Sequence, residues 1–182
     1  MLACLTGELM KRLFFALWPE PETRQALQRV SQLIPANDIK AVRPRNYHVT
    51  LVFLGNVDDA TALLISQRIG AISAKTFALS FDQLSYWRRP RVLCLTCSHA
   101  LAEYVNLAAA LEQEVSACGL QIESQTYTPH ITLARHARHA AEICFEPILW
   151  RAETFCLVES SSEPGGVVYR VLQQWPLIPV SQ

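Results

Sequence analysis

The sequence lacks an excess of charge of either sign, because 16 Lys and Arg balance 16 Asp and Glu in 182 residues. No overall field therefore attracts a polyanion, and any contact with nucleic acid must depend on local clusters of arginines. No apolar run is long enough to span a membrane. The apolar run 13–18 is also too short for a secretion signal, and it ends in Pro19–Glu22 without a cleavage site of small residues. We therefore expect a cytoplasmic protein that does not contact membranes.

The sequence also lacks the dense cysteine spacing of a disulfide framework, although it contains six cysteines. Cys94 and Cys97 form a C-x-x-C. Their segment, 91–97, has the pattern of a strand, in which residues three apart face opposite sides. No second pair of Cys or His has the spacing of zinc ligands. We expect buried, reduced thiols and neither a redox site nor a zinc site.

What the sequence does contain is a tetrapeptide of the form His-aliphatic-Thr-Leu that occurs twice, at residues 48–51 and 130–133. A lone His-x-Thr in a strand is usually a half-exposed polar face. With five histidines in the chain, two such copies would arise from composition with a chance on the order of one in ten thousand. Alternate side chains of a strand share a face, so each copy offers a cleft one imidazole and one hydroxyl. Two such strands facing each other would form a two-histidine site.

Two facing imidazoles can hold one neutral and one protonated member near neutral pH. His48 and His130 would then supply a base and an acid for in-line displacement at phosphorus, while Thr50 and Thr132 hold the non-bridging oxygens. A 2′,3′-cyclic phosphate is an attractive substrate because its ring is strained. No third metal ligand lies beside either motif, and no nucleophile elbow or phosphate-binding glycine loop occurs. The residues favour catalysis without a metal ion or cofactor.

Hydrophobic periodicity predicts three helices among about seven strands, which is an α+β fold class. Helices are expected at 26–34 and 101–118, and a third after Asp58 as its cap, with Leu63, Leu64 and Ile69 on the inner side. Strands are expected at 12–18, 47–54, 76–87, 92–97, 130–135, 145–150, 153–159 and 167–175. Residues 1–9 show no periodicity. We expect a single domain over 10–182, preceded by a disordered or dispensable extension.

Three segments carry a resemblance to a known family: 12–17 (RLFFAL), 47–55 (YHVTLVFLG) and 128–135 (TPHITLAR). The chain resembles the two-histidine (2H) phosphoesterase superfamily and, within it, the bacterial RNA 2′,3′-cyclic phosphodiesterase or 2′-5′ RNA ligase family. The resemblance covers nearly the whole chain from Met10. It implies a bilobal, pseudo-twofold fold, with two antiparallel-rich sheets around a central cleft and helices outside. It also implies hydrolysis of RNA 2′,3′-cyclic phosphate ends to 2′-phosphate ends, with possible reversible 2′-5′ joining of tRNA halves.

The resemblance also implies roles for individual residues. His48 would be the proton donor and His130 the proton acceptor, while Thr50 and Thr132 would bind phosphate. Arg135 would add positive charge on the face of Thr132 if the strand persists. Stacking of a base on Phe14 or Tyr127 is a further expectation.

Other functions remain open at this stage. The chain could act on small cyclic phosphates or 2′-5′ linked nucleotides, or it could bind RNA ends without catalysis. We expect RNA ends or small nucleotides as substrates, no metal and no cofactor, and a monomer that needs no protein partner. The other three histidines, His99, His136 and His139, are expected on the surface.

Overall fold

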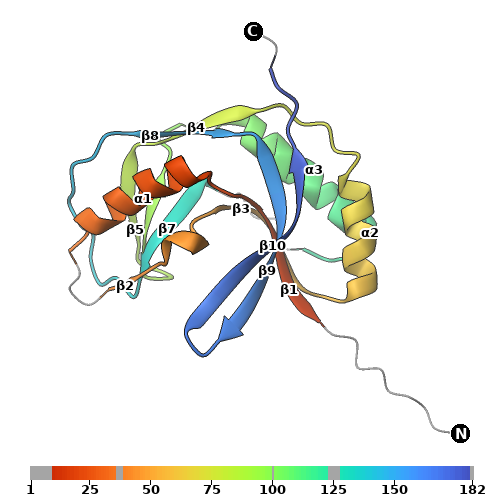
Figure 1. Cartoon of the computed structure of the whole chain (residues 1–182), viewed down its shortest axis with the longest axis horizontal. Helices are drawn as coiled ribbons and strands as arrows, with labels where there is room; N and C mark the ends of the chain where they lie inside the picture. Colours follow the sequence, from red (N-terminus) through yellow and green to blue (C-terminus); the bar gives the residue numbers. More distant parts are fainter. Residues whose placement is uncertain (1–9, 36–38, 100, 123–127, 181–182) are drawn as a thin grey trace, which may run out of the picture.

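The computed structural model of the chain describes residues 10–35, 39–99, 101–122 and 128–180 (Figure 1). The predicted extension 1–9 lies outside these residues. The helices are α1 (Pro21–Leu33), α2 (Asp59–Ile69), α3 (Ala102–Ala117) and the short 3-10 helix η1 (Pro44–Asn46). The strands are β1 (Lys11–Leu17), β2 (Lys40–Ala41), β3 (Val49–Val57), β4 (Phe77–Phe81), β5 (Gln83–Trp87), β6 (Val92–Thr96), β7 (His130–Arg135), β8 (Ile148–Ala152), β9 (Thr154–Glu163) and β10 (Gly166–Pro176).

The strands form two four-stranded antiparallel sheets and one two-stranded sheet. The first sheet has the order β10-β9-β1-β3, the second β2-β7-β6-β5, and the small sheet pairs β4 with β8. The two motif strands therefore belong to different sheets, β3 to the first and β7 to the second. In Figure 1, α2 and α3 lie together on one side of the molecule and α1 on the other. The predicted α+β class is confirmed.

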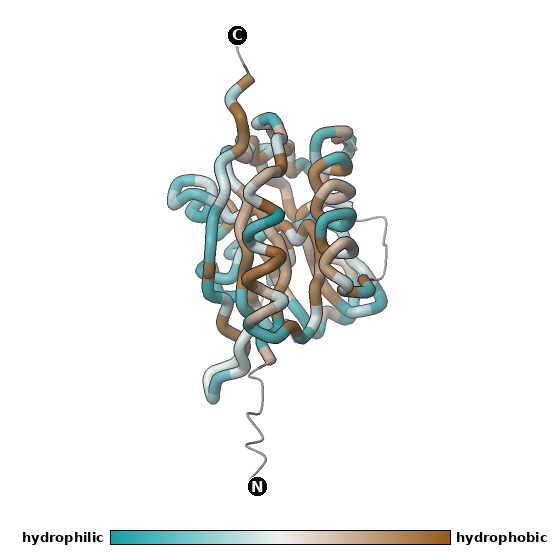
Figure 2. Tube along the Cα trace, turned by 90° about the vertical axis from the view of Figure 1, so that its right-hand side faces the viewer, coloured by the Kyte–Doolittle hydropathy of each residue, from teal (hydrophilic) through white to brown (hydrophobic). Residues whose placement is uncertain are grey.

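Strand β1 is buried on both faces, and this explains why it is visible in the sequence as a continuous apolar run. Leu13, Phe15 and Leu17 belong to the main hydrophobic core. Phe14 and Ala16 point to the other face, where they form a smaller buried cluster. In Figure 2 the apolar stretches gather along the central elements and many turns are hydrophilic. The small cluster matters for function because it lies beneath the first motif histidine.

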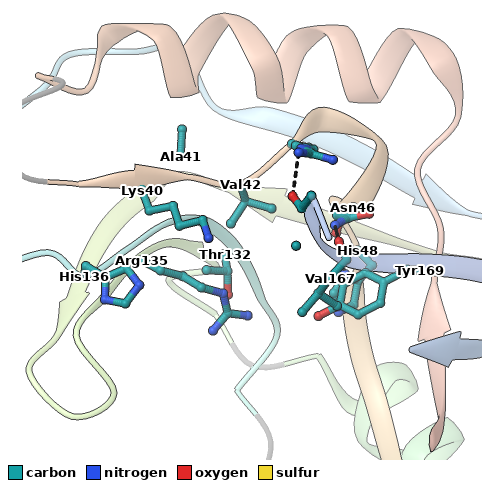
Figure 3. Close-up of a pocket in the computed structure, with 13 residues that line it drawn as sticks. Lys40, Ala41, Val42, Asn46, His48, Thr132, Arg135, His136, Val167 and Tyr169 are labelled. Atoms are coloured by element: carbon teal, nitrogen blue, oxygen red, sulfur yellow. Dashed lines mark hydrogen bonds between the residues drawn. The ribbon is translucent and has the colours of Figure 1, made fainter. Parts of the chain in front are cut away.

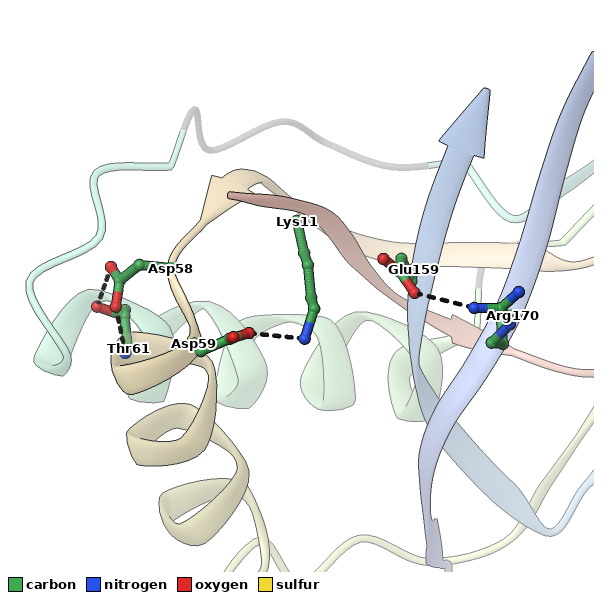
Figure 4. Close-up of polar contacts among 6 residues, drawn as sticks. All are labelled: Lys11, Asp58, Asp59, Thr61, Glu159 and Arg170. Atoms are coloured by element: carbon green, nitrogen blue, oxygen red, sulfur yellow. Dashed lines mark hydrogen bonds and ion pairs between the residues drawn. The ribbon is translucent and has the colours of Figure 1, made fainter. Parts of the chain in front are cut away.

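For the helix α2, the predicted cap is confirmed, but the predicted inner face is wrong. Asp58 caps α2, as predicted: its carboxylate accepts hydrogen bonds from the Thr61 backbone N–H at 2.8 Å and from the Thr61 hydroxyl at 2.7 Å (Figure 4). Leu63 and Leu64, however, are 62% and 45% exposed. The buried face carries Ile65 and Ile69, which are four residues apart and so lie one above the other on the helix.

Figure 4 shows two of the ion pairs that link neighbouring elements. The Lys11 ammonium at the start of β1 contacts Asp59 of α2 at 2.6 Å. Arg170 of β10 lies 3.8 Å from Glu159 of β9. Both pairs are partly exposed and contribute little to stability.

The predicted single strand 76–87 is wrong, because it is divided between two sheets. Its first half, β4, pairs with β8, while its second half, β5, pairs with β6. The break falls at Asp82, whose side chain accepts a hydrogen bond from the Ser98 backbone N–H at 2.9 Å. The alternation of apolar residues changes phase at this break, from Phe77, Leu79 and Phe81 to Leu84 and Tyr86. Periodicity therefore marks the break, but it does not show that the two halves join different sheets. No pattern in the sequence indicates β2 or η1, and β3 continues through Gly55 to Val57.

The thiols of the C-x-x-C lie where the sequence predicted. Cys94 is fully buried in β6 and Cys97 is partly buried just after it. Burial raises the pKa of Cys94 to about 12 and that of Cys97 to about 11. Protonated thiols are poor nucleophiles and poor metal ligands. Within the described ranges, no helix is long and apolar enough to cross a membrane.

Candidate active site

The two motif histidines line one cavity of about 390 Å³ between the two sheets, which we call the His cavity. His48 directly precedes β3, and His130 is the first residue of β7. Thr50 and Thr132 line the same cavity. The structure therefore brings together the imidazoles and hydroxyls that the repeated tetrapeptide placed in separate halves of the chain.

Both imidazoles are held in the same way. Nδ1 of His48 lies 2.7 Å from the carbonyl oxygen of Asn46, and Nδ1 of His130 lies 2.8 Å from the carbonyl oxygen of Thr128. A carbonyl oxygen can only accept, so Nδ1 must carry the proton in each ring. This leaves Nε2 of each histidine for proton exchange with a bound molecule.

His48 is enclosed by aromatic rings. Its ring stacks on Trp18, with the centroids 6.0 Å apart and the planes 17° apart. Phe14 lies 5.1 Å away and Tyr169 5.0 Å away, the latter edge-on. Phe14 belongs to β1, Trp18 directly follows it and Tyr169 belongs to β10, so two strands of the first sheet besides β3 shape the surroundings of His48. Figure 3 shows Tyr169 beside His48 at the edge of the cleft.

His130 contacts one aromatic ring among the described residues, that of Trp87 at the end of β5. The two centroids are 4.5 Å apart and the planes are inclined by 53°. Trp87 also lines the His cavity. His130 is therefore held as firmly as His48 by its hydrogen bond but is less covered by aromatic rings.

Burial has unequal effects on the two imidazoles. It lowers the pKa of His48 to about 4, assisted by the nearby His130 and Arg135. The pKa of His130 is also lowered, mainly by burial and further by Arg135, but by a smaller amount. Removing a cation from water costs free energy, so the ring with more apolar neighbours loses its proton more readily. Both histidines are thus neutral in the unliganded cavity at neutral pH.

Arg135 reaches the His cavity through an irregularity in β7. It lies three residues past Thr132, so in a regular strand it would point to the opposite face. The expectation that an uninterrupted strand puts the two on one face is therefore wrong. Cys94 pairs with Thr132 and Leu93 with Ala134, which leaves Leu133 unpaired as a β-bulge. The bulge reverses the alternation, and Arg135 joins Thr132 in lining the cavity.

The two predicted base-stacking residues have different outcomes. Phe14 is 2% exposed, packs against His48 and does not line the cavity, so its ring has no free face for a base. That expectation is wrong, because β1 is buried on both faces. Phe53, the partner of Phe14 across β1 and β3, lines the cavity instead and is 50% exposed. Tyr127 lies outside the described residues.

Sequence reasoning missed Trp87 and Tyr169, which line the cavity, and Trp18, which covers His48. Trp87 ends β5, Trp18 directly follows β1 and Tyr169 lies within β10, and none of the three carries a motif of its own. Sequence reasoning also missed Asn46. Its side-chain amide donates to the Val167 carbonyl at 2.9 Å, and its backbone carbonyl oxygen accepts the hydrogen bond from His48. Asn46 thus joins the histidine to the β9–β10 hairpin.

The His cavity offers a metal ion few ligands. Apart from His48 and His130, its lining contains no Cys, Asp or Glu side chain among the described residues. Across the described part of the chain, no group of three or more such residues could hold a metal ion. The polar groups of the lining include two imidazoles, one guanidinium and the hydroxyls of Thr50, Thr128, Thr132 and Tyr169, a set that suits an anion with several oxygens.

The sequence matches the family described as LigT like Phosphoesterase over residues 17–94 and 97–169. The RNA 2′,3′-cyclic phosphodiesterase of Escherichia coli is 31% identical over 170 residues, which span 92% of this chain and 97% of that protein. The protein of the same name from Thermus thermophilus is 30% identical over 181 residues, which span 91% of this chain and 90% of that protein.

Solved structures show the same similarity. The crystal structure of E. coli LigT in apo form superposes with a TM-score of 0.83 at 28% identity, covering 94% of this chain and 99% of that chain. E. coli LigT complexed with 3′-AMP gives a TM-score of 0.82 at 28% identity, covering 93% of this chain and 99% of that chain. This chain therefore shares its fold with E. coli LigT over nearly its whole length.

Proposed function

This chain belongs to the LigT-like phosphoesterase family, and we propose that it hydrolyses the 2′,3′-cyclic phosphate ends of RNA to 2′-phosphate ends without a metal ion. The observation that carries the proposal is the pair of imidazoles on one cavity, each with Nδ1–H fixed by a carbonyl and Nε2 free. The names of the E. coli and T. thermophilus relatives point to the same reaction.

In this mechanism the two histidines have opposite tasks. Nε2 of His130 accepts a proton from water, and the water oxygen forms a bond to phosphorus. The bond between phosphorus and the ribose 3′ oxygen breaks, and Nε2 of His48 donates a proton to that oxygen. One water is consumed and a 2′-phosphate remains. Each proton transfer would contribute about 10²–10⁴-fold to the rate.

The low pKa of His48 requires that the substrate itself change the protonation of this residue. In the unliganded cavity His48 is neutral, since its pKa is about 4. A bound phosphodiester carries a negative charge, and an opposite charge within a few ångströms favours the imidazolium. His48 would therefore take up a proton as the cyclic phosphate binds. The same charge interacts with Arg135 and the hydroxyls of Thr50 and Thr132, which would hold the non-bridging oxygens.

The test is incubation of the protein with a short RNA that ends in a 2′,3′-cyclic phosphate, with chelator present. Mass spectrometry should show a gain of one water, and phosphatase treatment with sequencing of the end should identify a 2′-phosphate. Binding of the RNA without turnover from pH 5 to 9 would overturn the proposal in favour of an RNA-end binder. Loss of turnover in chelator would indicate a metal-dependent mechanism.

A second candidate is the hydrolysis of small cyclic phosphates. It is favoured by the E. coli relative, which has been solved in complexes with 3′-AMP and with NADP+. Comparing kcat/KM for a cyclic-phosphate-ended oligonucleotide with that for a nucleoside 2′,3′-cyclic phosphate separates the two candidates. A higher value for the nucleoside would favour the small substrate.

A further inference from the structure

A second cavity, of about 190 Å³, lies beside the His cavity (Figure 3). We call it the Lys40 cavity. It shares His48, Thr132, Arg135 and Tyr169 with the His cavity, so the two spaces meet at the reacting groups. A ligand bound by the histidines can therefore extend into the Lys40 cavity without leaving the protein surface.

Two side chains hold one wall of the Lys40 cavity in place: Asn46 of η1, and Arg43, which directly precedes η1. Arg43 donates to the carbonyl of Gly165 at 2.6 Å, and Asn46 donates to that of Val167 at 2.9 Å. Both bonds fasten the turn between β9 and β10 to the chain segment before His48. The Lys40 cavity is thus bounded on two sides by segments that are tied to each other.

The charge of the Lys40 cavity is of one sign. Lys40 on β2 and Arg135 on β7 lie directly opposite each other in the antiparallel register. Like charges at such positions repel, and a bound anion would remove the repulsion. In the described part of the chain neither cation has an ion-pair partner, and no acidic side chain lines the cavity. Figure 3 shows the Lys40 amine and the Arg135 guanidinium directed into the same space.

We propose that the Lys40 cavity binds the 5′-phosphate group of the nucleoside whose 2′,3′-cyclic phosphate lies between the histidines. This inference rests on the proposed function. The two phosphates of one nucleotide are joined through a single ribose, and the two cavities adjoin each other at the residues that line both. In an RNA chain the 5′-phosphate is the diester that links the terminal nucleotide to the preceding one, whereas in a mononucleotide it is a free monoester. The site would make the protein prefer RNA ends to unphosphorylated nucleosides.

The experiment compares three substrates: adenosine 2′,3′-cyclic phosphate, the same compound with a 5′-phosphate, and a dinucleotide that ends in a 2′,3′-cyclic phosphate. Replacing Lys40→Gln should lower kcat/KM for the second and third substrates by about 10-fold, mainly through KM, because one charge-assisted hydrogen bond is lost. The first substrate should be unaffected. Lys40→Arg should retain most of the activity. Lys75→Gln, which removes the same charge from an exposed site outside both cavities, should change nothing.

The outcomes separate the inference from the proposed function. A loss with the 5′-phosphorylated nucleoside or with the dinucleotide, and not with adenosine 2′,3′-cyclic phosphate, supports the site and shows which source of phosphate it accepts. Equal losses for all three substrates, or no loss for any, would overturn the inference while the hydrolytic function stands. If the wild-type protein turned over none of the three, the proposed function would fail and the inference with it.

Discussion

The two halves of the cleft contain the same tetrapeptide pattern and the same kind of hydrogen bond, yet they give their histidines different surroundings. Each imidazole donates Nδ1–H to the carbonyl two residues earlier, at 2.7 Å for His48 and 2.8 Å for His130. His48 is covered by three aromatic rings, from Phe14, Trp18 and Tyr169, whereas His130 contacts the ring of Trp87 in the described part of the chain.

In each half, the carbonyl two residues before the histidine fixes the tautomer, whereas the side chains of other strands set the pKa. Backbone geometry within three residues determines which nitrogen carries the proton. The aromatic rings come from strands distant in sequence, and they make His48 the weaker base. The two imidazoles are therefore unequal before any substrate binds, which distinct acid and base roles require.

The largest expected effect comes from removing either imidazole. His48→Ala and His130→Ala should each lower kcat by at least about 10²-fold, because each removes one proton transfer from the same step. The measurement is turnover of the cyclic-phosphate-ended RNA under chelator. The double variant should be only slightly worse than either single variant, since the two groups act together.

The control for these variants is the melting temperature together with the circular dichroism spectrum, which show whether each variant is folded. His99→Ala, at an exposed position outside both cavities, is a matched substitution that should retain full activity. A folded His48→Ala or His130→Ala protein with wild-type turnover would show that only one half of the cleft is catalytic.

The next effect concerns stability in acid. The pKa of His48 is about 4 in the folded protein against 6.5 for the free side chain, so between these values the unfolded state binds more protons. The free energy of unfolding must therefore fall as the pH is lowered through this range. The His48 contribution is at most about 3 kcal/mol, from 1.36 kcal/mol for each unit of difference. His48→Gln should remove this part of the acid sensitivity.

Urea denaturation at pH 7 and at pH 4.5 measures this effect in the wild type, in His48→Gln and in the matched variant His130→Gln. The pH dependence should flatten more for His48→Gln, because the pKa of His130 is lowered less. Equal flattening in the two variants would mean that the aromatic cover does not distinguish the two halves.

Much of the fold could be predicted because its strands carry local patterns. The continuous run of β1 and the helix ended by Pro35 follow from residues that are neighbours in sequence. The phase change of the alternation at Asp82 indicates a break in 76–87, but the change of sheet could not be predicted, because the pattern does not state which strand is the partner. Apolar character alone predicts that Leu63 and Leu64 face inward, but the buried face of α2 is set by what packs against it.

The site divides in the same way. The four motif residues, His48, Thr50, His130 and Thr132, could be found because they repeat. Trp87 could not, since its contact with His130 is created by pairing of β5, β6 and β7. Arg135 was predicted for the wrong reason, namely an uninterrupted strand. It lines the cavity because of a β-bulge in β7, and no residue pattern in the sequence indicates that bulge.

The threonines allow a finer comparison of the two halves. Thr50→Val and Thr132→Val should each lower kcat/KM by about 10-fold, because each loses one hydrogen bond to a charged phosphate oxygen. Thr50 is 5% exposed and Thr132 is partly exposed, so the apolar side chain of valine should lower the stability of the protein less at position 50 than at position 132. Serine at either position keeps the hydroxyl and should retain most of the activity. A tenfold loss with serine as well would indicate packing and not hydrogen bonding.

The smallest effect tests the cause of the difference directly. Trp18→Ala should admit water to His48 and raise the pKa of that residue by about half a unit to one unit, while the pKa of His130 stays the same. Trp87→Ala should instead raise the pKa of His130 and leave that of His48 unchanged. Histidine NMR titration of both variants measures the two values separately. Arg24 lies over the ring of Trp18, 5.8 Å from its centroid, so Arg24→Gln is the control that keeps the ring and removes the nearby cation. If Trp18→Ala shifted the pKa of both histidines alike, the ring of Trp18 would not be the cause of the difference between their pKa values.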